Sequence, residues 1–276
     1  MQLDILRFIQ SFTHPALDIL FAGFSMLSEP IVIVPLLALT YWCIDKRMGR
    51  YLLFSLCFSL CINGIIKDFF KAPRPFGEPG ITSRRIWSAT GHSFPSGHTQ
   101  SAAAIWGGAS LWAKKRWLTG IAIICVIGVG LSRLYLGVHY PADALAGALA
   151  GFFCAATAYW IIMKNDGIKS IVWLGLLLAI AILWIGESKD TFFALALYIG
   201  FSAGSWVEQR YIHFSLPTNL RQSLHRFTLG LASTGLIFYP IYRLKELHPG
   251  LAPICYGFLA FYVVGPCTAL FKKAHV

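Results

Sequence analysis

The sequence predicts an all-α membrane protein that crosses the bilayer many times, and three observations support this. Of the 276 residues, 57% are hydrophobic and only 13% are charged. The mean hydropathy is +0.64, and the apolar residues gather in runs of helical length. Soluble domains usually carry about 25% charged residues. The composition therefore excludes an ordinary soluble domain, a disordered chain and a small disulfide-bonded domain.

The elements follow in order along the chain. Residues 1–14 mix apolar and polar side chains on a helical period, and we expect them to lie along the membrane surface. Ten apolar runs follow, at 15–28, 30–44, 51–66, 97–113, 117–136, 142–163, 170–186, 191–207, 227–242 and 250–271. The first two are short for ~30 Å of hydrocarbon. They form either two crossings or one bent or re-entrant hairpin around Glu29 and Pro30.

The composition changes near residue 165, and we divide the chain there. The region 15–165 carries unusual clusters of His, Arg, Asp and Pro at the ends of its apolar runs. The region 166–276 has apolar runs with ordinary loops, and we expect about four additional transmembrane helices in it. The seven cysteines lie in or beside apolar runs, so we expect them to act as small hydrophobic packing residues.

The net charge of +11 comes from 23 Lys and Arg against 12 Asp and Glu. The basic residues form short clusters between apolar runs, which is typical of loops beside anionic headgroups. We therefore expect a lipid bilayer as partner and no nucleic acid. If the N-terminus is inside and every run crosses, fourteen Lys and Arg lie inside and nine outside. The positive-inside rule favours that orientation.

Three segments at the ends of apolar runs carry chemically active side chains. The segments are 67–75 with Lys67, Arg74 and Pro75; 94–99 with Pro95, Ser96, Gly97 and His98; and 132–143 with Ser132, Arg133, His139 and Asp143. In the topology above, all three meet at the outer face.

Positive charge is concentrated in these segments. Lys67, Arg74 and Arg133 supply three cations, and an arginine side chain matches the oxygens of a phosphate group. Ser96 is suited to cap a helix, and Gly97 lets a ligand approach the backbone closely. Free N–H groups in the first turn of a helix bind phosphate readily.

Two histidines complete the set. His139 lies four residues before Asp143, so the carboxylate is placed to fix the imidazole tautomer and leave the other ring nitrogen as a nucleophile. His98 lies in the first turn of its helix, where it is placed to give a proton to a leaving oxygen. These residues favour phosphoryl transfer through a phosphohistidine, with the cations stabilising the oxygens.

The three segments together resemble the signature of the type 2 phosphatidic acid phosphatase superfamily, K-x6-RP, PSGH and SR-x5-H-x3-D. Every fixed position is matched, and the resemblance covers about residues 15–163. It implies that His139 is the nucleophile, Asp143 its partner, and His98 the general acid and then the base. The residues that it implies for phosphate binding are Lys67, Arg74, Ser96, Gly97 and Arg133.

The resemblance also implies a six-helix phosphatase core in 15–165 and hydrolysis of a lipid phosphate without a metal or other cofactor. Possible substrates are polyprenyl diphosphate, phosphatidylglycerol phosphate and phosphatidic acid. The expected location is the plasma (inner) membrane, with the active site on the exoplasmic or periplasmic side. A lipid-linked phosphotransferase with the same phosphohistidine is the alternative, and a transporter or scaffold is a third interpretation.

The stretch 76–94 joins the first two segments and combines Gly and Pro with two adjacent arginines and aromatic residues. We expect it to form a mobile cover over the site. In that interpretation Arg84 or Arg85 contacts a second phosphate or a headgroup. An ordinary interfacial loop with lipid-anchoring Arg and Trp is the alternative.

Overall fold

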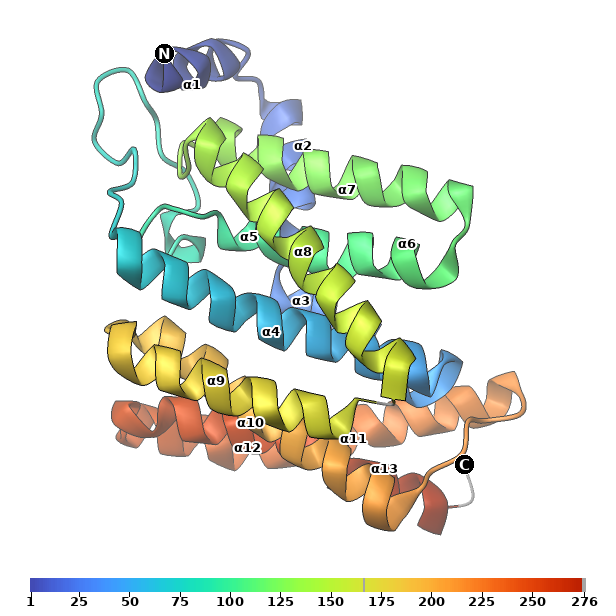
Figure 1. Ribbon diagram of the computed structural model, residues 1–276. Coiled ribbons are helices and arrows are strands. Elements are labelled where there is room, and N and C mark those ends of the chain that lie inside the picture. The colour runs from blue at the N-terminus through green and yellow to red at the C-terminus, as the bar shows by residue number, and fades with distance from the viewer. Residues whose placement is uncertain (166, 275–276) are drawn as a thin grey trace.

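The protein is all-helical over the residues that its computed structural model describes, 1–165 and 167–274, with no strand among them. This confirms the predicted fold class. Figure 1 shows long, roughly parallel helices in two groups on either side of α4. The α-helices are α1 (Gln2–Ser11), α2 (Pro15–Met26), α3 (Pro30–Leu39), α4 (Lys46–Phe70), α5 (Gly97–Ala102), α6 (Gly108–Ala113), α7 (Arg116–Tyr135), α8 (Pro141–Asn165), α9 (Ile168–Ile185), α10 (Lys189–Val207), α11 (Leu220–Leu247), α12 (Ala252–Val264) and α13 (Pro266–Lys273).

Several helices are long and apolar enough to cross a membrane. By length and composition these are 46–70, 116–135, 141–164, 168–185 and 249–273, and the bent pair of α2 and α3 passes the same test when taken as one span. Within the described residues, the helical part between α4 and α7 is continuous from Gly97 to Ala113, with a π-helical turn at Ala103–Gly107. The protein is therefore embedded in a membrane.

The two short apolar runs at 15–28 and 30–44 follow one another as a bent pair, with 45° between their axes. Hydrogen bonds place the two ends of this pair at opposite ends of the molecule. Near its start, Asp18 accepts a hydrogen bond from Tyr135 at the end of α7. At its other end, Tyr41 donates to the Val264 carbonyl at the end of α12. The pair thus runs through the molecule once as a single bent span, which differs from both predicted alternatives, two crossings and a hairpin.

This arrangement corrects the predicted position of the N-terminus. Helix α1 lies at the same end as the three sequence segments, because Gln10 donates hydrogen bonds to the carbonyls of Thr82 and Tyr135. The prediction of two crossings placed it at the opposite end. The physical reason is that each run is too short to cross alone, while Pro30 starts a second helix that continues onward at an angle.

Helix α4 is the central element and carries the first chemical segment at its C-terminal end. It begins at Lys46, where the Asp45 carboxylate accepts hydrogen bonds from the backbone N–H groups of Arg47 and Met48. It ends at Phe70, and Lys71 adopts the left-handed conformation with φ 49°. One face of α4 packs against α8 and another against α10. The two helix groups therefore share it (Figure 1).

The second group, α9 to α13, packs through glycines. A side chain on Gly200 of α10 would collide with the Gly257 carbonyl of α12, and one on Gly204 would collide with Phe261 and Val264. Small residues let two helices approach closely where hydrophobic burial cannot drive association inside a bilayer. The predicted division at 165/166 falls between the end of α8 and the start of α9. The region 15–165 holds the bent pair, α4, the 97–113 helix, α7 and α8.

Candidate functional site

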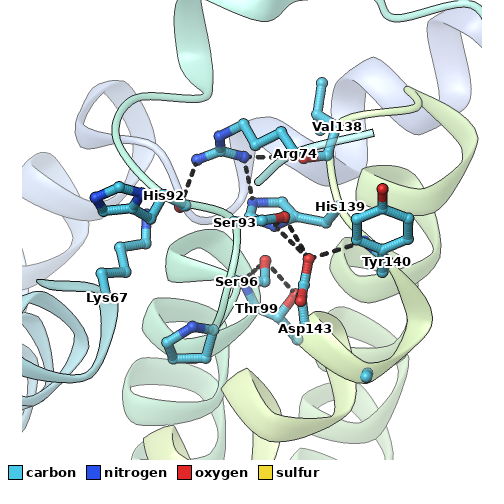
Figure 2. A network of polar contacts seen from close by, with 12 residues as sticks. Lys67, Arg74, His92, Ser93, Ser96, Thr99, Val138, His139, Tyr140 and Asp143 are labelled. Carbon is cyan, nitrogen blue, oxygen red and sulfur yellow. Dashed lines mark hydrogen bonds and ion pairs between the residues drawn. The ribbon is translucent and has the colours of Figure 1, made fainter. Parts of the chain in front are cut away.

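The three segments that the sequence singled out meet at one end of the helix bundle. Lys67 lies in the last turn of α4, and Arg74 lies in the loop that follows it. Ser96 precedes α5, His139 lies in the turn that joins α7 to α8, and Asp143 lies in the first turn of α8. Figure 2 shows their side chains around one network of polar contacts. Residues about 70 positions apart in sequence are thus neighbours in space.

His139 is the centre of this network and is 1% exposed. Its Nδ1 lies 3.3 Å from Asp143 Oδ2. The same carboxylate oxygen accepts hydrogen bonds from the Ser93 hydroxyl and, at 2.9 Å, from the Tyr140 backbone N–H. Because a carboxylate accepts only, we assign the ring proton to Nδ1. Nε2 then presents its lone pair on the other side of the ring, as the four-residue spacing predicts.

The turn that carries His139 depends on a glycine. Gly137 has φ +65°, and a Cβ there would lie 2.6 Å from the Thr82 carbonyl oxygen. Only glycine fits such a left-handed position against a neighbouring backbone without strain. The loop 76–94 is therefore packed directly against the turn, and Ser83 Oγ donates to the Gly137 carbonyl at 2.8 Å.

Arg74 lies against the Nε2 side of the imidazole. Its Nη1 is 3.1 Å from His139 Nε2 and donates to the Val138 carbonyl at 2.9 Å. Its Nε donates to the Gly91 carbonyl, and its Nη2 donates to the Thr90 carbonyl at 2.6 Å. Burial lowers the pKa of Arg74 to about 10, so the side chain still carries its charge at neutral pH. Lys67 Nζ also donates to the Thr90 carbonyl, at 3.3 Å.

The electrostatics keep His139 neutral. Burial, followed by the charges of Arg74, Arg133 and Lys67, holds the pKa of His139 well below its ordinary value of 6.5. A neutral imidazole whose Nε2 carries no proton is the form that a nucleophile requires.

Arg133 has unused hydrogen-bonding capacity. It is fully buried near the end of α7, and its Nη1 donates to the hydroxyls of Ser25 at 2.8 Å and Ser88 at 3.2 Å. Its Nε and Nη2 are buried without a hydrogen-bond partner among the described residues. Buried polar groups normally have partners, and a guanidinium is suited to two oxygens of one anion. The unpartnered groups therefore fit a site for an oxyanion.

Ser96 and Gly97 fix the start of α5. The Ser96 hydroxyl accepts a hydrogen bond from the Thr99 backbone N–H, which is the predicted cap. The Ser96 backbone N–H donates to the Asp143 carbonyl at 2.9 Å and so ties α5 to α8. A side chain on Gly97 would lie 3.3 Å from Asn63 Oδ1 on α4. Three helices thus converge at these two residues.

The second histidine, His98, has a partner that sequence reasoning missed. His98 Nε2 lies 3.7 Å from Glu29 Oε1, at the break between α2 and α3. The sequence marks Glu29 and Pro30 only as a helix break, since neither belongs to a motif. Ser93 was missed too, although it lies only three residues before Ser96 and in the same loop as the second segment.

Arg84 and Arg85, predicted as headgroup contacts, each pair with a carboxylate of the bent pair. Arg84 Nη1 lies 2.6 Å from Asp18 Oδ1, and Arg85 Nη2 lies 2.8 and 3.0 Å from the two oxygens of Glu29. Arg85 also lies over the Trp87 ring at 4.6 Å. In this conformation the loop is fastened to the bent pair, and contact with a headgroup stays a prediction.

The donor set around the site is rich in cations and poor in metal ligands. Among the residues that the structure describes, no group of three or more His, Cys, Asp or Glu is placed to hold a metal ion. The side chains that converge here suit an anion instead.

Comparison with known proteins gives two matching families. Residues 49–167 match the PAP2 superfamily. Residues 192–276 match the family described as PAP2 superfamily phosphatase, transmembrane extension.

Curated relatives and a solved structure agree with these families. The chain is 23% identical over 224 residues to dihydrosphingosine 1-phosphate phosphatase YSR3 of Saccharomyces cerevisiae, covering 71% of this chain and 54% of the relative. It is 30% identical over 132 residues to the putative undecaprenyl-diphosphatase YbjG of Escherichia coli, covering 46% and 66%. The crystal structure of Aquifex aeolicus LpxE superposes with a TM-score of 0.50 at 28% identity, covering 57% of this chain and 94% of that one. The chain thus spans about half to two thirds of the length of these curated relatives.

Proposed function

The chain belongs to the PAP2 superfamily, and on that premise we propose that it is a membrane phosphatase that hydrolyses a lipid phosphomonoester or diphosphate. Two curated relatives are named for a sphingoid phosphate and a polyprenyl diphosphate. The observation that carries the proposal is the His139 imidazole, held between Asp143 at Nδ1 and Arg74 at Nε2. Candidate substrates are polyprenyl diphosphate, phosphatidylglycerol phosphate and phosphatidic acid.

In the first step, the Nε2 lone pair of His139 attacks phosphorus, and the bond to the leaving oxygen breaks. His98 donates a proton to that oxygen, so the products are a phosphohistidine and a lipid alcohol or lipid monophosphate. Asp143 keeps its charge and stabilises the positive ring that forms. The buried position of this pair keeps water away from the nucleophile until substrate has bound.

In the second step, a water molecule attacks phosphorus and gives its proton to His98. The bond between phosphorus and Nε2 breaks, its electron pair returns to the ring, and inorganic phosphate leaves. The enzyme is then restored with His139 neutral and His98 protonated.

The cations hold the transferred group through both steps. Arg74 is already placed beside Nε2, and within the described part of the chain Arg133 has two buried donors without hydrogen-bond partners. Lys67 adds a point charge, and Ser96 and Gly97 supply the start of α5. Positive charge and donors arranged in advance around the equatorial oxygens lower the barrier for phosphoryl transfer.

The distribution of charge supports an active site on the exoplasmic side of the plasma membrane. With α1 at the site end, thirteen Lys and Arg lie at the opposite end or in its loops and ten at the site end. The positive-inside rule assigns the opposite end to the cytoplasm. The catalytic His139 then lies near the outer headgroups, where a lipid phosphate is presented.

The test is release of phosphate from a panel of lipid mono- and diphosphates, with the full-length protein in detergent micelles and excess chelator. We expect release with at least one lipid, no loss on chelation, and loss of activity in His139→Ala. An added alcohol acceptor separates hydrolysis from phosphotransfer, because a transferase forms a phosphorylated acceptor in place of inorganic phosphate. Wild-type protein that releases nothing from any member, or His139→Ala with full activity, contradicts the proposal.

A further inference from the structure

Glu29 is a charged residue in a position where charged side chains are rare. It occupies the break between α2 and α3, and its side chain is 11% exposed. An ionised carboxylate inside a membrane helix pair is costly and marks a functional position unless it is purely structural. The bend at Glu29 and Pro30 turns the backbone so that the carboxylate faces α5 instead of the surrounding bilayer.

Three groups from three elements converge on this carboxylate. His98 of α5 lies 3.7 Å away, and Arg85 of the 76–94 loop makes two hydrogen bonds to it. The Ser25 hydroxyl donates to it at 3.1 Å and also accepts from Arg133 Nη1. Glu29 is thereby linked to both the second and the third catalytic segments, although it belongs to neither.

The charge around His98 explains why a carboxylate is required there. A general acid must carry its proton before the reaction, yet Arg133 and Lys67 act on this imidazole with unfavourable positive charge, and Glu29 is the carboxylate that acts on it favourably. Arg85 also faces Glu29 and donates to both of its oxygens, including the one nearest His98. Burial and these cations disfavour the imidazolium that leaving-group protonation needs, and Glu29 acts against them.

We infer that Glu29 is a second site carboxylate, a positioning residue that orients His98 and stabilises its protonated form, as Asp143 serves His139. This inference rests on the proposed function, in which His98 protonates the leaving oxygen. Glu29 does not touch the transferred phosphoryl group. His98 gives up the proton, and Glu29 stays ionised throughout. Each histidine then has its own carboxylate, and of the two only Asp143 belongs to a sequence motif.

The test exploits the leaving group. An aryl phosphate such as p-nitrophenyl phosphate leaves with little need for protonation, whereas the alkyl oxygen of a lipid monophosphate depends on it. The value of kcat/KM reports the step up to leaving-group departure. In Glu29→Gln we expect kcat/KM to fall about 100-fold for the lipid monophosphate and less than about threefold for the aryl phosphate, within the range for general acid catalysis.

The matched control is Asp18→Asn. Asp18 is the other carboxylate of the bent pair, and it pairs with Arg84, the neighbour of Arg85, and with Tyr135, but with no histidine among the residues that the structure describes. We expect this variant to lower kcat/KM for both substrates by the same small factor. In a His98→Gln background, adding Glu29→Gln is expected to leave the ratio of the two substrates unchanged, because the group through which Glu29 acts is gone.

The outcomes distinguish the inference from the function beneath it. Equal losses on both substrates in Glu29→Gln, or a further change of ratio in the His98→Gln background, overturn the role of Glu29 while the phosphatase stands. Wild-type protein without phosphatase activity overturns both. If Glu29→Gln does not fold, Glu29→Asp decides, because it keeps the charge: a folded Glu29→Asp protein is expected to keep the wild-type ratio within about threefold, and a 100-fold change in it overturns the inference.

Discussion

The motif-bearing region, α4 to α8, and the appended region, α9 to α13, both bury charged side chains, but they use them differently. In the motif-bearing region, the buried side chains Asp68, Arg133 and Asp143 gather at the end that holds the site, and Arg133 has two donors without a hydrogen-bond partner among the described residues. In the appended region, Glu208 lies at the opposite end and is paired with Lys46 of α4. The first arrangement has capacity for an anion, whereas the second joins two helix groups.

This difference indicates that the role of the appended region is more structural than chemical. Its helices α10 and α12 are held together by glycines, and its polar contacts to the motif-bearing region are largely structural. Asp68, one residue after Lys67, accepts hydrogen bonds from the backbone N–H groups of Glu187 and Ser188 and from the Thr191 hydroxyl. The turn between α9 and α10 is thus docked directly on the end of α4 that carries the site.

The largest expected effect tests whether the motif-bearing region carries the catalytic chemistry. Replacing the motif histidine, His139→Gln, is expected to lower kcat by at least about 10³-fold, because the nucleophile is lost while binding groups remain. Rapid quenching with labelled substrate should trap a phosphoenzyme in the wild type and none in the variant. His225→Gln, a histidine of the appended helix α11, is the control and should keep wild-type turnover. A trapped phosphoenzyme in His139→Gln contradicts the assignment.

The second effect concerns charge within the motif-bearing region. Arg74→Gln is expected to lower kcat/KM about 100-fold, because a charge-assisted contact to the phosphate is lost. It should also move the acid limb of the pH profile upward. Burial and then Arg74 lower the pKa of His139, so the neutral nucleophile persists below pH 6.5 and is lost as pH falls through that depressed pKa. Without Arg74 the pKa of His139 is lowered less, so activity is lost at a higher pH.

The measurement for Arg74→Gln is kcat/KM against pH for one substrate with both proteins. The substrate phosphate also titrates, with a pKa near about 6, but it does so equally in the two experiments. The difference between the two limbs therefore belongs to the enzyme. An unmoved or lowered limb in Arg74→Gln would show that this cation does not set the charge state of His139.

The third effect tests the packing of the appended region. Gly200→Ala is expected to destabilise the protein by about 2 kcal/mol, because the new methyl group overlaps the Gly257 carbonyl and the helices must separate. Gly235→Ala in α11 is the matched control, since nothing lies within 4 Å of its added methyl group. Thermal unfolding in detergent should separate them, with Gly235→Ala equal to or above wild type. Equal melting temperatures would mean that α10 and α12 do not rely on this contact.

The sequence predicts the local contacts of this site, but it does not predict the contacts between distant segments. The four-residue spacing of His139 and Asp143 predicts their contact, because a carboxylate in the first turn of α8 can reach back to the turn that precedes the helix. The three segments share an end because alternating spans return the chain to the same side. Ser93 and Glu29 have no such local signal, since their positions depend on how a loop and a bent helix pair pack against distant elements.

The first helices show the same limit for the fold. Hydropathy finds the apolar runs at 15–28 and 30–44, but it does not give the 45° angle between the resulting helices or the number of times they cross. The number of crossings decides at which end of the molecule α1 lies. It is made by long-range contacts such as Tyr41 with Val264, which join residues more than 200 positions apart. No periodicity within one segment carries such information.

The smallest expected effect lies where the two regions meet. Asp190, in the first turn of α10, accepts a hydrogen bond from the Thr90 hydroxyl at 2.7 Å. The Thr90 carbonyl in turn accepts from both Lys67 and Arg74. Asp190→Asn weakens this support by about 1 kcal/mol, so kcat/KM should fall about fivefold.

The control for Asp190 is Glu187→Gln, a substitution just before α10 that removes an exposed ion pair between Glu187 and Lys71. It should change kcat/KM by less than about twofold. Because Asp190 acts on phosphate-binding cations and not on the nucleophile, the loss should appear mainly in KM. A loss confined to kcat, or equal losses in Asp190→Asn and Glu187→Gln, would mean that the appended region supports the site only through general packing. A loss specific to Asp190 would mean that the appended helices hold two of the cations in place through a single threonine.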